Sequence, residues 1–360
     1  MIDGAPARWM KHRLLLLTLF LSAPLALSIH AADSLVLARF SDYLEALRVQ
    51  TGIPGLAATI TQNGDVVWEH GFGLSDVDRN VGVRPDTAFQ IDGLTQYIVA
   101  SLALRCHESG WISVDDLAST YAPGQADATS TLRMLMTHTS QGPSGLVFAY
   151  RLDRLAPMAP AISACTDSSF RSGIAALLTR MGMYDSVPGT DAAGLAPGAE
   201  GFGAGDLQRF TGVLSRLAVG YMVDGKGHAS PSSYRAATLT PSGGLISTVR
   251  DLAKFDLALR SGLVVRPATL AIMWSAPPNL TGPALPHGMG WFVQTVDGEP
   301  VVWQFGSDTA SSSLSLTLPR RAMTLIMLAN SNGLAQSFNL AAGDLSSSPF
   351  ARLFLGTFAR

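Results

Sequence analysis

The chain has 360 residues, of which 47% are apolar and 14% are charged, and its formal net charge is −2 at pH 7. This length is enough to build a sizeable core in one large domain or two ordinary ones. The near-neutral charge offers no electrostatic basis for nucleic-acid binding, which depends on clustered Lys and Arg.

The N-terminal residues have the composition of a secretory signal peptide. Basic residues at positions 8, 11 and 13 precede an apolar run at 14–27, and small residues follow. We predict a signal peptide over residues 1–31, cleaved after Ala31, and therefore a periplasmic or secreted protein. The apolar run is short for a transmembrane span. Membrane contact is expected only in the alternative case, in which the leader is retained as an anchor.

The apolar spacing then predicts helices and strands in a definite order along the first part of the chain. An amphipathic helix is expected over 34–50, followed by a strand at 56–60, an Asn63-Gly64 hairpin turn and a return strand at 66–69. Further helices are expected at 95–107, from 114, at 132–137, and at 170–180.

The last third of the chain is predicted to return to strands. A helix over 249–260 comes first, with Thr248 as its N-cap and Asp251 completing a capping box. Strands are expected at 290–296, 301–305, 311–318 and 323–328, and a final helix at 345–359. Strands at both ends with helices between them predict an α+β fold, in which N- and C-terminal strands form one antiparallel sheet beside a mostly helical insert.

The cysteines and histidines indicate no metal site, and no cofactor motif is found. Cys106 and Cys165 fit neither a metal motif nor a CxxC motif. They could form a disulfide in an oxidising compartment or remain two small buried side chains, and the sequence leaves both alternatives open. The histidines after residue 31 form no HxH or HxxxH pair, so zinc is not indicated.

Several blocks of this sequence resemble the serine β-lactamases and penicillin-binding proteins, in the branch of class C β-lactamases, esterases and DD-peptidases. The matching blocks are Ile53-Pro54-Gly55-Leu56, Gly71-Phe72-Gly73, Asp86-Thr87-Ala88-Phe89, the segment from Gly110 to Asp116, the segment from Leu132 to Ser140, the segment from Met181 to Ser186, the segment from Pro241 to Phe255, Met289-Gly290-Trp291 and Leu328-Ala329-Asn330. The resemblance implies a β-lactamase/transpeptidase-like fold over residues 32–360. An α/β part at about 34–90 and 240–360 would then enclose a helical insert at about 91–239.

The family's nucleophile and base are missing from the positions where the resemblance places them. The family uses a serine at a helix start and a lysine three residues later. Aligned through the flanking blocks, these positions hold Gly93 and Gln96. The three lysines, Lys11, Lys226 and Lys254, follow no Ser or Thr at that spacing, so no other Ser-x-x-Lys pair exists in the chain.

Two further family motifs have also lost polar side chains. The Tyr-x-Asn motif aligns with Tyr150-Arg151-Leu152, which keeps only the tyrosine. The Lys-Thr-Gly or His-x-Gly motif of the edge strand aligns with Gln304-Phe305-Gly306, which keeps only the glycine. Glycine and glutamine can neither attack a carbonyl nor take up a proton.

The sequence therefore predicts a pseudoenzyme that binds a peptide, a peptidoglycan-like fragment or a protein partner, with no confident catalytic residue. One alternative is an active hydrolase of β-lactam, ester or D-amino-acid peptide bonds that uses non-standard residues. The other is an envelope scaffold whose cleft has no role. Thr95 and Ser140 are hydroxyls near the expected site, but we interpret them as cap or turn residues and His138 as a packing residue.

Overall fold

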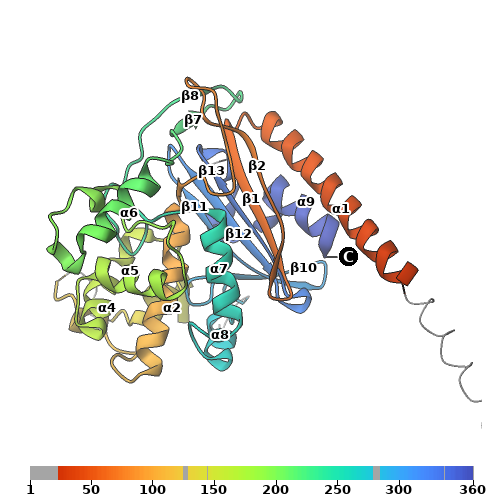
Figure 1. The fold of residues 1–360 in the computed structure, drawn as a ribbon. Coiled ribbons are helices and arrows are strands. Elements are labelled where there is room, and N and C mark those ends of the chain that lie inside the picture. The colour runs from red at the N-terminus through yellow and green to blue at the C-terminus, as the bar shows by residue number, and fades with distance from the viewer. Residues whose placement is uncertain (1–22, 125–128, 144, 279–283, 336, 360) are drawn as a thin grey trace, which may run out of the picture.

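The main antiparallel sheet joins strands from the two ends of the chain (Figure 1). The computed structural model describes residues 23–124, 129–143, 145–278, 284–335 and 337–359, with side chains from residue 34 onward. In spatial order the strands are β10 (Phe292–Val296), β11 (Glu299–Ser307), β12 (Ser312–Leu318), β13 (Met323–Ala329), β1 (Gly55–Gln62), β2 (Asp65–Asp76) and β3 (Val81–Gly82). The β1–β13 pairing, with Leu56 opposite Ala329, joins the N-terminal hairpin to the C-terminal strands and confirms the predicted sheet.

Alternating side chains on these strands build a core on each face of the sheet. On β13, Leu325 and Met327 point into one core, whereas Ile326 and Leu328 point into the other. This period of two follows from the pleat of the strand. Each such buried aliphatic side chain stabilises the fold by about 1.5–3 kcal/mol.

Helices from both termini cover one face of the sheet. They are α1 (Ala23–Gln50) and α9 (Pro349–Phe358), which lie side by side in Figure 1. The ring of Phe40 in α1 packs edge-on against Phe354 and Phe358 in α9. The two terminal helices therefore share one core, which agrees with the pairing of N- and C-terminal strands in the sheet.

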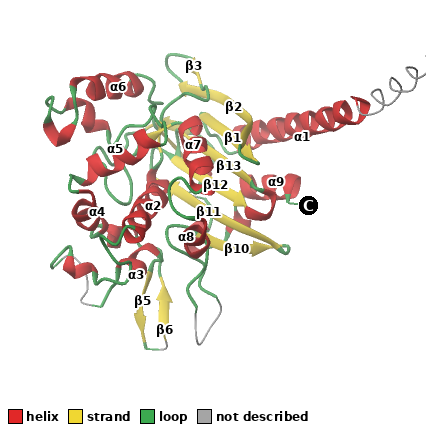
Figure 2. Cartoon of the chain, turned by 60° about the horizontal axis from the view of Figure 1, so that its bottom comes forward, coloured by secondary structure: helices red, strands yellow, loops and turns green. Residues whose placement is uncertain are grey.

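The opposite face carries the helices that belong to the site. They are α2 (Thr95–Glu108), α7 (Val249–Arg260) and α8 (Pro267–Met273). Beyond them lie α3 (Leu132–Met136), α4 (Met158–Thr166), α5 (Phe170–Arg180) and α6 (Ala204–Leu214). Figure 2 shows a hairpin of β5 (Thr139–Gly142) and β6 (Gly145–Phe148) extending below α3 and away from the main sheet. Two further short strand pairs are β4 (Phe89–Gln90) with β9 (Ile246–Ser247), and β7 (Tyr221–Val223) with β8 (Ala229–Pro231).

Most predicted elements are confirmed, and the differences have local causes. Helices α5 and α7 have the predicted bounds, and the Thr248 hydroxyl accepts the predicted capping bond from the Asp251 N–H. The second half of the capping box is wrong, because the Asp251 carboxylate accepts instead from the Asp185 N–H at 2.8 Å and from Lys254 Nζ at 2.7 Å. Asp251 therefore ties α7 to the helical part of the chain.

The predicted helix from residue 114 is wrong. Residues 114 and 115 form a turn, and a 3-10 helix follows at Ala118–Thr120. The Asp116 carboxylate accepts from the Ser113 N–H at 2.8 Å and from the Tyr121 hydroxyl at 2.6 Å. These local bonds offer the backbone an alternative to helix, as short acidic side chains commonly do.

Helix α1 extends further toward the N-terminus than the predicted start at residue 34, since it already includes Ala23, where the described part of the chain begins. The side chains of the predicted signal peptide, residues 1–31, lie outside the part of the chain that the structure describes. Among the described residues, no helix is both long and apolar enough to cross a bilayer.

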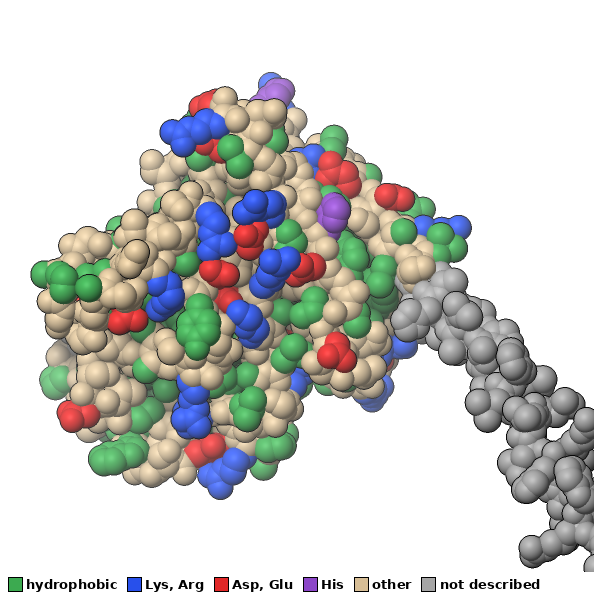
Figure 3. Space-filling view, viewed as in Figure 1, with side chains coloured by type: hydrophobic (Ala, Val, Ile, Leu, Met, Phe, Trp, Pro, Cys, Tyr) green, Lys and Arg blue, Asp and Glu red, His purple; other side chains and the backbone are tan. Residues whose placement is uncertain are grey.

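Positive and negative side chains alternate on the face shown in Figure 3. Arg216 pairs with both Asp86 and Asp185, and Arg250 pairs with Glu69. Surface pairs of this kind each contribute only about 0–1 kcal/mol. Such pairing keeps charges of opposite sign close together.

Candidate active site

The site lies where the chain enters α2 against the end of β11. A 3-10 helix, η1 (Asp92–Leu94), leads directly into α2. The Ser313 hydroxyl on β12 donates to the Ile91 carbonyl at 2.7 Å and holds this entrance against the sheet. Gly93 lies in η1 and Gln96 lies in the first turn of α2, so the two positions that the resemblance aligns with a nucleophile and its base stand at a helix start.

Gly93 is in such close contact with β11 that no larger residue fits without a shift. A Cβ atom added there would lie 2.6 Å from the Phe305 carbonyl oxygen, 3.3 Å from Gly306 Cα and 3.4 Å from the Tyr150 hydroxyl. Gly306 is equally confined, because its added Cβ would lie 2.4 Å from the Ile91 carbonyl oxygen. The two glycines therefore let the backbone of η1 pack directly on the backbone of β11.

Gln96, which the resemblance aligns with the family's base, has both ends of its amide hydrogen-bonded. Its side chain is only 3% exposed. Its Nε2 donates to the Tyr150 hydroxyl at 2.6 Å, and its Oε1 lies 2.8 Å from His138 Nε2. The Arg151 N–H donates to His138 Nδ1 at 3.1 Å, so a neutral His138 must carry its proton on Nε2 and donate to Gln96.

The hydrogen-bond chain continues to β11. The Tyr150 hydroxyl donates to Gln304 Oε1 at 3.3 Å, and Gln304 Nε2 donates to the Gly290 carbonyl at 3.0 Å. Gln304 Nε2 also lies 3.3 Å from His287 Nε2. Because His287 Nδ1 lies 2.6 Å from the Gly288 carbonyl, Nδ1 carries the proton and Nε2 is free to accept. The amide, hydroxyl and imidazole groups in this chain are therefore paired without any charge.

Burial keeps the histidines and the tyrosine of this network neutral. Burial lowers the pKa of His138 to about 3 and that of His287 well below its usual range. Burial also raises the pKa of the Tyr150 hydroxyl above its usual range. At neutral pH neither histidine is basic enough to deprotonate a hydroxyl, and the tyrosine stays protonated.

A buried carboxyl group, Asp92, stands next to Gly93. Its backbone is left-handed, with φ of 47°. Ser311 Oγ donates to it at 2.7 Å and Gln90 Nε2 donates at 2.9 Å. Burial, only partly offset by these hydrogen bonds, raises the pKa of Asp92 to about 7. Asp92 is not among the residues that line the pocket beside Gly93. Its hydrogen bonds to Ser311 and Gln90 hold η1 in place.

The structure thus brings together Gly93, Gln96, Tyr150, Gln304 and Gly306. The sequence analysis interpreted His138 as a packing residue, whereas the structure shows it hydrogen-bonded to Gln96 and Arg151. Sequence reasoning missed His287, and nothing in the sequence around His287 indicates its role.

The two other hydroxyls do not form a substitute catalytic pair. The Thr95 hydroxyl is fully buried and has no hydrogen-bond partner. Ser140 lies in the β5–β6 hairpin opposite Val147. Both ring nitrogens of His138 are engaged by Gln96 and Arg151, so His138 is not available to activate Ser140.

A pocket of about 280 Å³ remains open beside this network. Its lining residues come from η1, the end of β11, the segment after β6 and the segment after β13. They are Gly93, Tyr150, Leu152, Phe305, Ser307, Ala335, Phe338 and Ala341. The hydrogen-bonded network therefore leaves open space beside Gly93.

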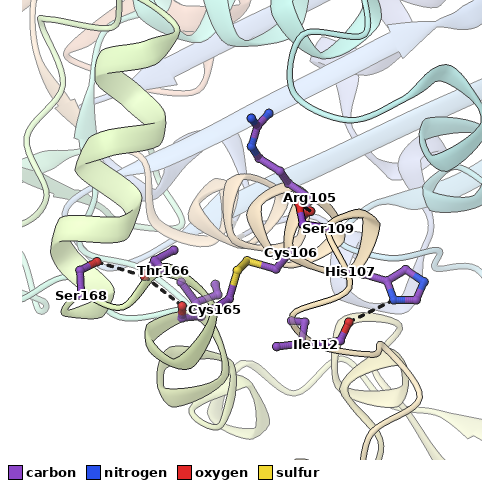
Figure 4. The surroundings of a disulfide bond; sticks show 9 residues. Arg105, Cys106, His107, Ser109, Ile112, Cys165, Thr166 and Ser168 are labelled. Atoms are coloured by element: carbon purple, nitrogen blue, oxygen red, sulfur yellow. Dashed lines mark hydrogen bonds between the residues drawn. A yellow bond between two sulfur atoms is a disulfide. The ribbon is translucent and has the colours of Figure 1, made fainter.

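A disulfide fastens the far end of the site helix (Figure 4). Cys106, near the C-terminus of α2, is bonded to Cys165 in α4, with 6.0 Å between their Cα atoms. Of the two alternatives that the sequence left open, a disulfide or two separate buried side chains, the structure contains the disulfide. In the described part of the chain no group of three or more His, Cys, Asp or Glu side chains is placed to hold a metal ion.

Comparison with known proteins concerns the family and the fold of this chain. The profile of the family described as Beta-lactamase matches residues 40–345. PbpX of Bacillus subtilis (strain 168) is 33% identical over 103 residues, which are 28% of this chain and 25% of PbpX. The match therefore spans only about a quarter of that relative's length.

Solved structures share the fold at low sequence identity. The octameric penicillin-binding protein homologue from Pyrococcus abyssi has a TM-score of 0.69 and 19% identity, over 89% of this chain and 77% of that chain. The class C beta lactamase from Rhodobacter sphaeroides has a TM-score of 0.65 and 16% identity, over 87% and 96% of the two chains. At these identities the likeness concerns the fold alone.

Proposed function

The chain belongs to the beta-lactamase family of serine hydrolases and penicillin-binding-protein-like proteins, and we propose that this member binds a ligand in the family cleft without forming a covalent intermediate. The proposed ligand is a peptide, a peptidoglycan-like fragment or a partner protein's segment. Binding without turnover is physically reasonable, because recognition and bond cleavage depend on different groups in a site.

The observation that carries this proposal is the neutral bridge made by Gln96. Serine attack needs a nearby group that accepts the hydroxyl proton, and such activation commonly accounts for a large part of the rate. Gln96 has no useful proton affinity, and its amide is already bonded to His138 and Tyr150. The close contact of Gly93 with Phe305 also leaves no space for a nucleophile at that position.

Covalent labelling tests the proposal directly. We expect the purified protein to show no labelling by a fluorescent penicillin or a fluorophosphonate, and no hydrolysis of nitrocefin or p-nitrophenyl esters. An active class C β-lactamase at equal concentration is the positive control. Stoichiometric labelling of this chain would establish the alternative of an active hydrolase and would identify its nucleophile by peptide mapping.

The double variant Gly93→Ser/Gln96→Lys tests whether the two missing residues alone account for the expected lack of hydrolytic activity. We expect it to remain inactive, because Gln304 replaces a third reactive group and the Phe305 carbonyl occupies the space needed by the serine. Recovery of nitrocefin hydrolysis would show that the rest of the site is still competent.

The open pocket favours a binding role over a scaffold role. A scaffold has no need for a cavity next to the former nucleophile position, whereas a binding protein needs one. Two results together would support the scaffold alternative. The protein would bind no cell-wall peptide or small molecule in the pocket, and it would still bind a partner protein after the pocket is blocked.

We also propose that the protein is exported. The Cys106–Cys165 bond supports this, because disulfides persist mainly in oxidising compartments. Fractionation of expressing cells and mass spectrometry of the mature N-terminus test it. We expect an N-terminus at residue 32, whereas a chain that keeps residues 1–31 would indicate a retained anchor.

A further inference from the structure

The pocket beside Gly93 has a lining that is unusual for the site of a polar ligand. Three of its residues are aromatic, namely Tyr150, Phe305 and Phe338. Small or aliphatic residues make up most of the rest, and Ser307 adds one hydroxyl. Among the described residues that line the pocket, none carries a charge.

The polar atoms behind the pocket do not add positive charge. The Tyr150 hydroxyl is bonded to Gln96 and Gln304, so its donor is already used. His138 and His287 are buried and neutral, for the reasons given above. The carboxyl group nearest to Gly93 along the chain, Asp92, is acidic and so could not attract an anion.

The two arginines that follow the pocket residue Tyr150 in the sequence, Arg151 and Arg154, bind other groups. The Arg151 guanidinium pairs with Asp153, with an N–O distance of 2.6 Å. The Arg154 guanidinium donates to the Thr139 carbonyl at 2.9 Å and to the Ser130 hydroxyl at 2.8 Å. Neither side chain is among those that line the pocket.

From this lining we propose that the pocket beside Gly93 binds an uncharged aromatic or aliphatic group and discriminates against a carboxylate. The inference rests on the proposed function and narrows its ligand. A carboxylate that enters a site without a cationic partner loses hydration that nothing replaces. A ring or a branched alkyl group loses little favourable hydration on entering the pocket, and it gains contact with the aromatic side chains. A peptide would therefore enter through an apolar side chain or a blocked end rather than through a free C-terminus.

The size of the pocket limits this group to a small one. Its volume of about 280 Å³ lies just below the usual range for sites that hold a drug-sized molecule. A single ring with a short substituent fits this space. The aromatic walls formed by Tyr150 and Phe305, whose ring centroids are 5.2 Å apart, can pack against its faces or edges.

A matched pair of probes tests the discrimination. Phenylacetamide and phenylacetate have nearly the same shape and differ at neutral pH by one negative charge. We expect ligand-observed NMR titration to give phenylacetamide an affinity at least about tenfold higher, a difference of about 1.4 kcal/mol. Equal affinities, or tighter binding of phenylacetate, would overturn the proposal. Binding of neither probe at about 10 mM, where even weak fragments register, would overturn it as well.

Two neighbouring alanines supply a variant and its control. Ala341 is exposed and lines the pocket, whereas Ala342 is exposed and does not. Ala341→Trp should block the pocket and abolish phenylacetamide binding, and Ala342→Trp should leave the affinity unchanged. Binding that survives Ala341→Trp would place the probe elsewhere and refute the site.

A positive charge placed at the rim should reduce or remove the preference for phenylacetamide. Ala341→Lys should raise the affinity for phenylacetate by about tenfold, because it supplies the missing cation at a partly screened position. Failure of this inference would be distinct from failure of the proposed function. Hydrolysis of p-nitrophenyl esters would disprove the non-covalent role even if the probes discriminated as expected, and a preference for phenylacetate without turnover would disprove only the ligand class.

Discussion

Replacing Gly93 with alanine should destabilise the protein even though the backbone conformation of Gly93 suits any residue. Its φ is not positive, so the strain comes from packing alone. The added methyl group would lie 2.6 Å from the Phe305 carbonyl oxygen, whereas an ordinary contact begins at 3.4 Å, so the oxygen must retreat by about 0.8 Å (3.4 − 2.6). The strand is poorly placed to move, because Gly306 is paired with Ser313 and is tight against Ile91 on the same side.

The expected loss follows from two opposing effects. Overpacking of this kind costs about 1–3 kcal/mol. The lower entropy of the unfolded chain after a glycine-to-alanine change offsets about 0.4–1 kcal/mol. We therefore expect the free energy of unfolding to fall by about 1–2 kcal/mol, which is a decrease in Tm of about 1–3 °C for a chain of this length.

Denaturant titration monitored by tryptophan fluorescence measures this change. The midpoint should fall while the slope m stays constant, because the surface exposed on unfolding is unchanged. Gly212→Ala is the matched control. Gly212 lies inside α6 with no atom within 4 Å of an added Cβ, so the same change should stabilise the helix by up to about 1 kcal/mol. If Gly93→Ala proved as stable as the parent while the control behaved as expected, the close-contact argument would be wrong.

Three further predictions concern Gln96, the disulfide and Asp92. Gln96→Lys should lower stability more than Gln96→Met in thermal unfolding. The lysine ammonium would be buried without a carboxylate at a cost on the order of several kcal/mol. Methionine instead leaves His138 without its acceptor and Tyr150 without the N–H from Gln96, at a cost of about 1–3 kcal/mol for a buried group left unpaired. Equal stabilities of the two variants would contradict the description of the site as neutral. Reduction of the disulfide, or the double variant Cys106→Ala/Cys165→Ala, should lower the free energy of unfolding by about 2–4 kcal/mol, since the bridge links residues 59 positions apart in the chain. An unchanged denaturation midpoint under reducing agent would show that the bridge does not stabilise the fold. Because the folded pKa of Asp92 is about 7, against an ordinary value of 3.8, its contribution to stability is fully present below about pH 4 and is lost as the pH rises to about 7. Asp92→Asn should remove this decline from a series of denaturation curves, and parallel curves for the two proteins would refute the buried-acid interpretation.

Much of the fold follows from local patterns in the chain. The helices at 170–180 and 249–260 have the bounds that the sequence predicts. For the second helix, apolar residues at helical spacing and the capping residue Thr248 mark the start. The Asn63-Gly64 turn and the alternation in residues 311–318 likewise predicted strands that the sheet contains. Where prediction failed, as at residues 114–117, a side-chain hydrogen bond in the turn outweighed helix propensity.

The sequence by itself determined that the chain lacks a Ser-x-x-Lys pair, since that is a matter of residue identity and spacing. Only the tertiary structure decided what replaces it. The bonds from Gln96 to His138 and to Tyr150 join residues that are 42 and 54 positions apart. The contact between Gly93 and β11 and the bond between Gln304 and His287 likewise join separate elements. Such contacts depend on how the sheet and the helices are packed together, and no local pattern encodes them. The same is true of the uncharged pocket, whose walls come from four separate parts of the chain.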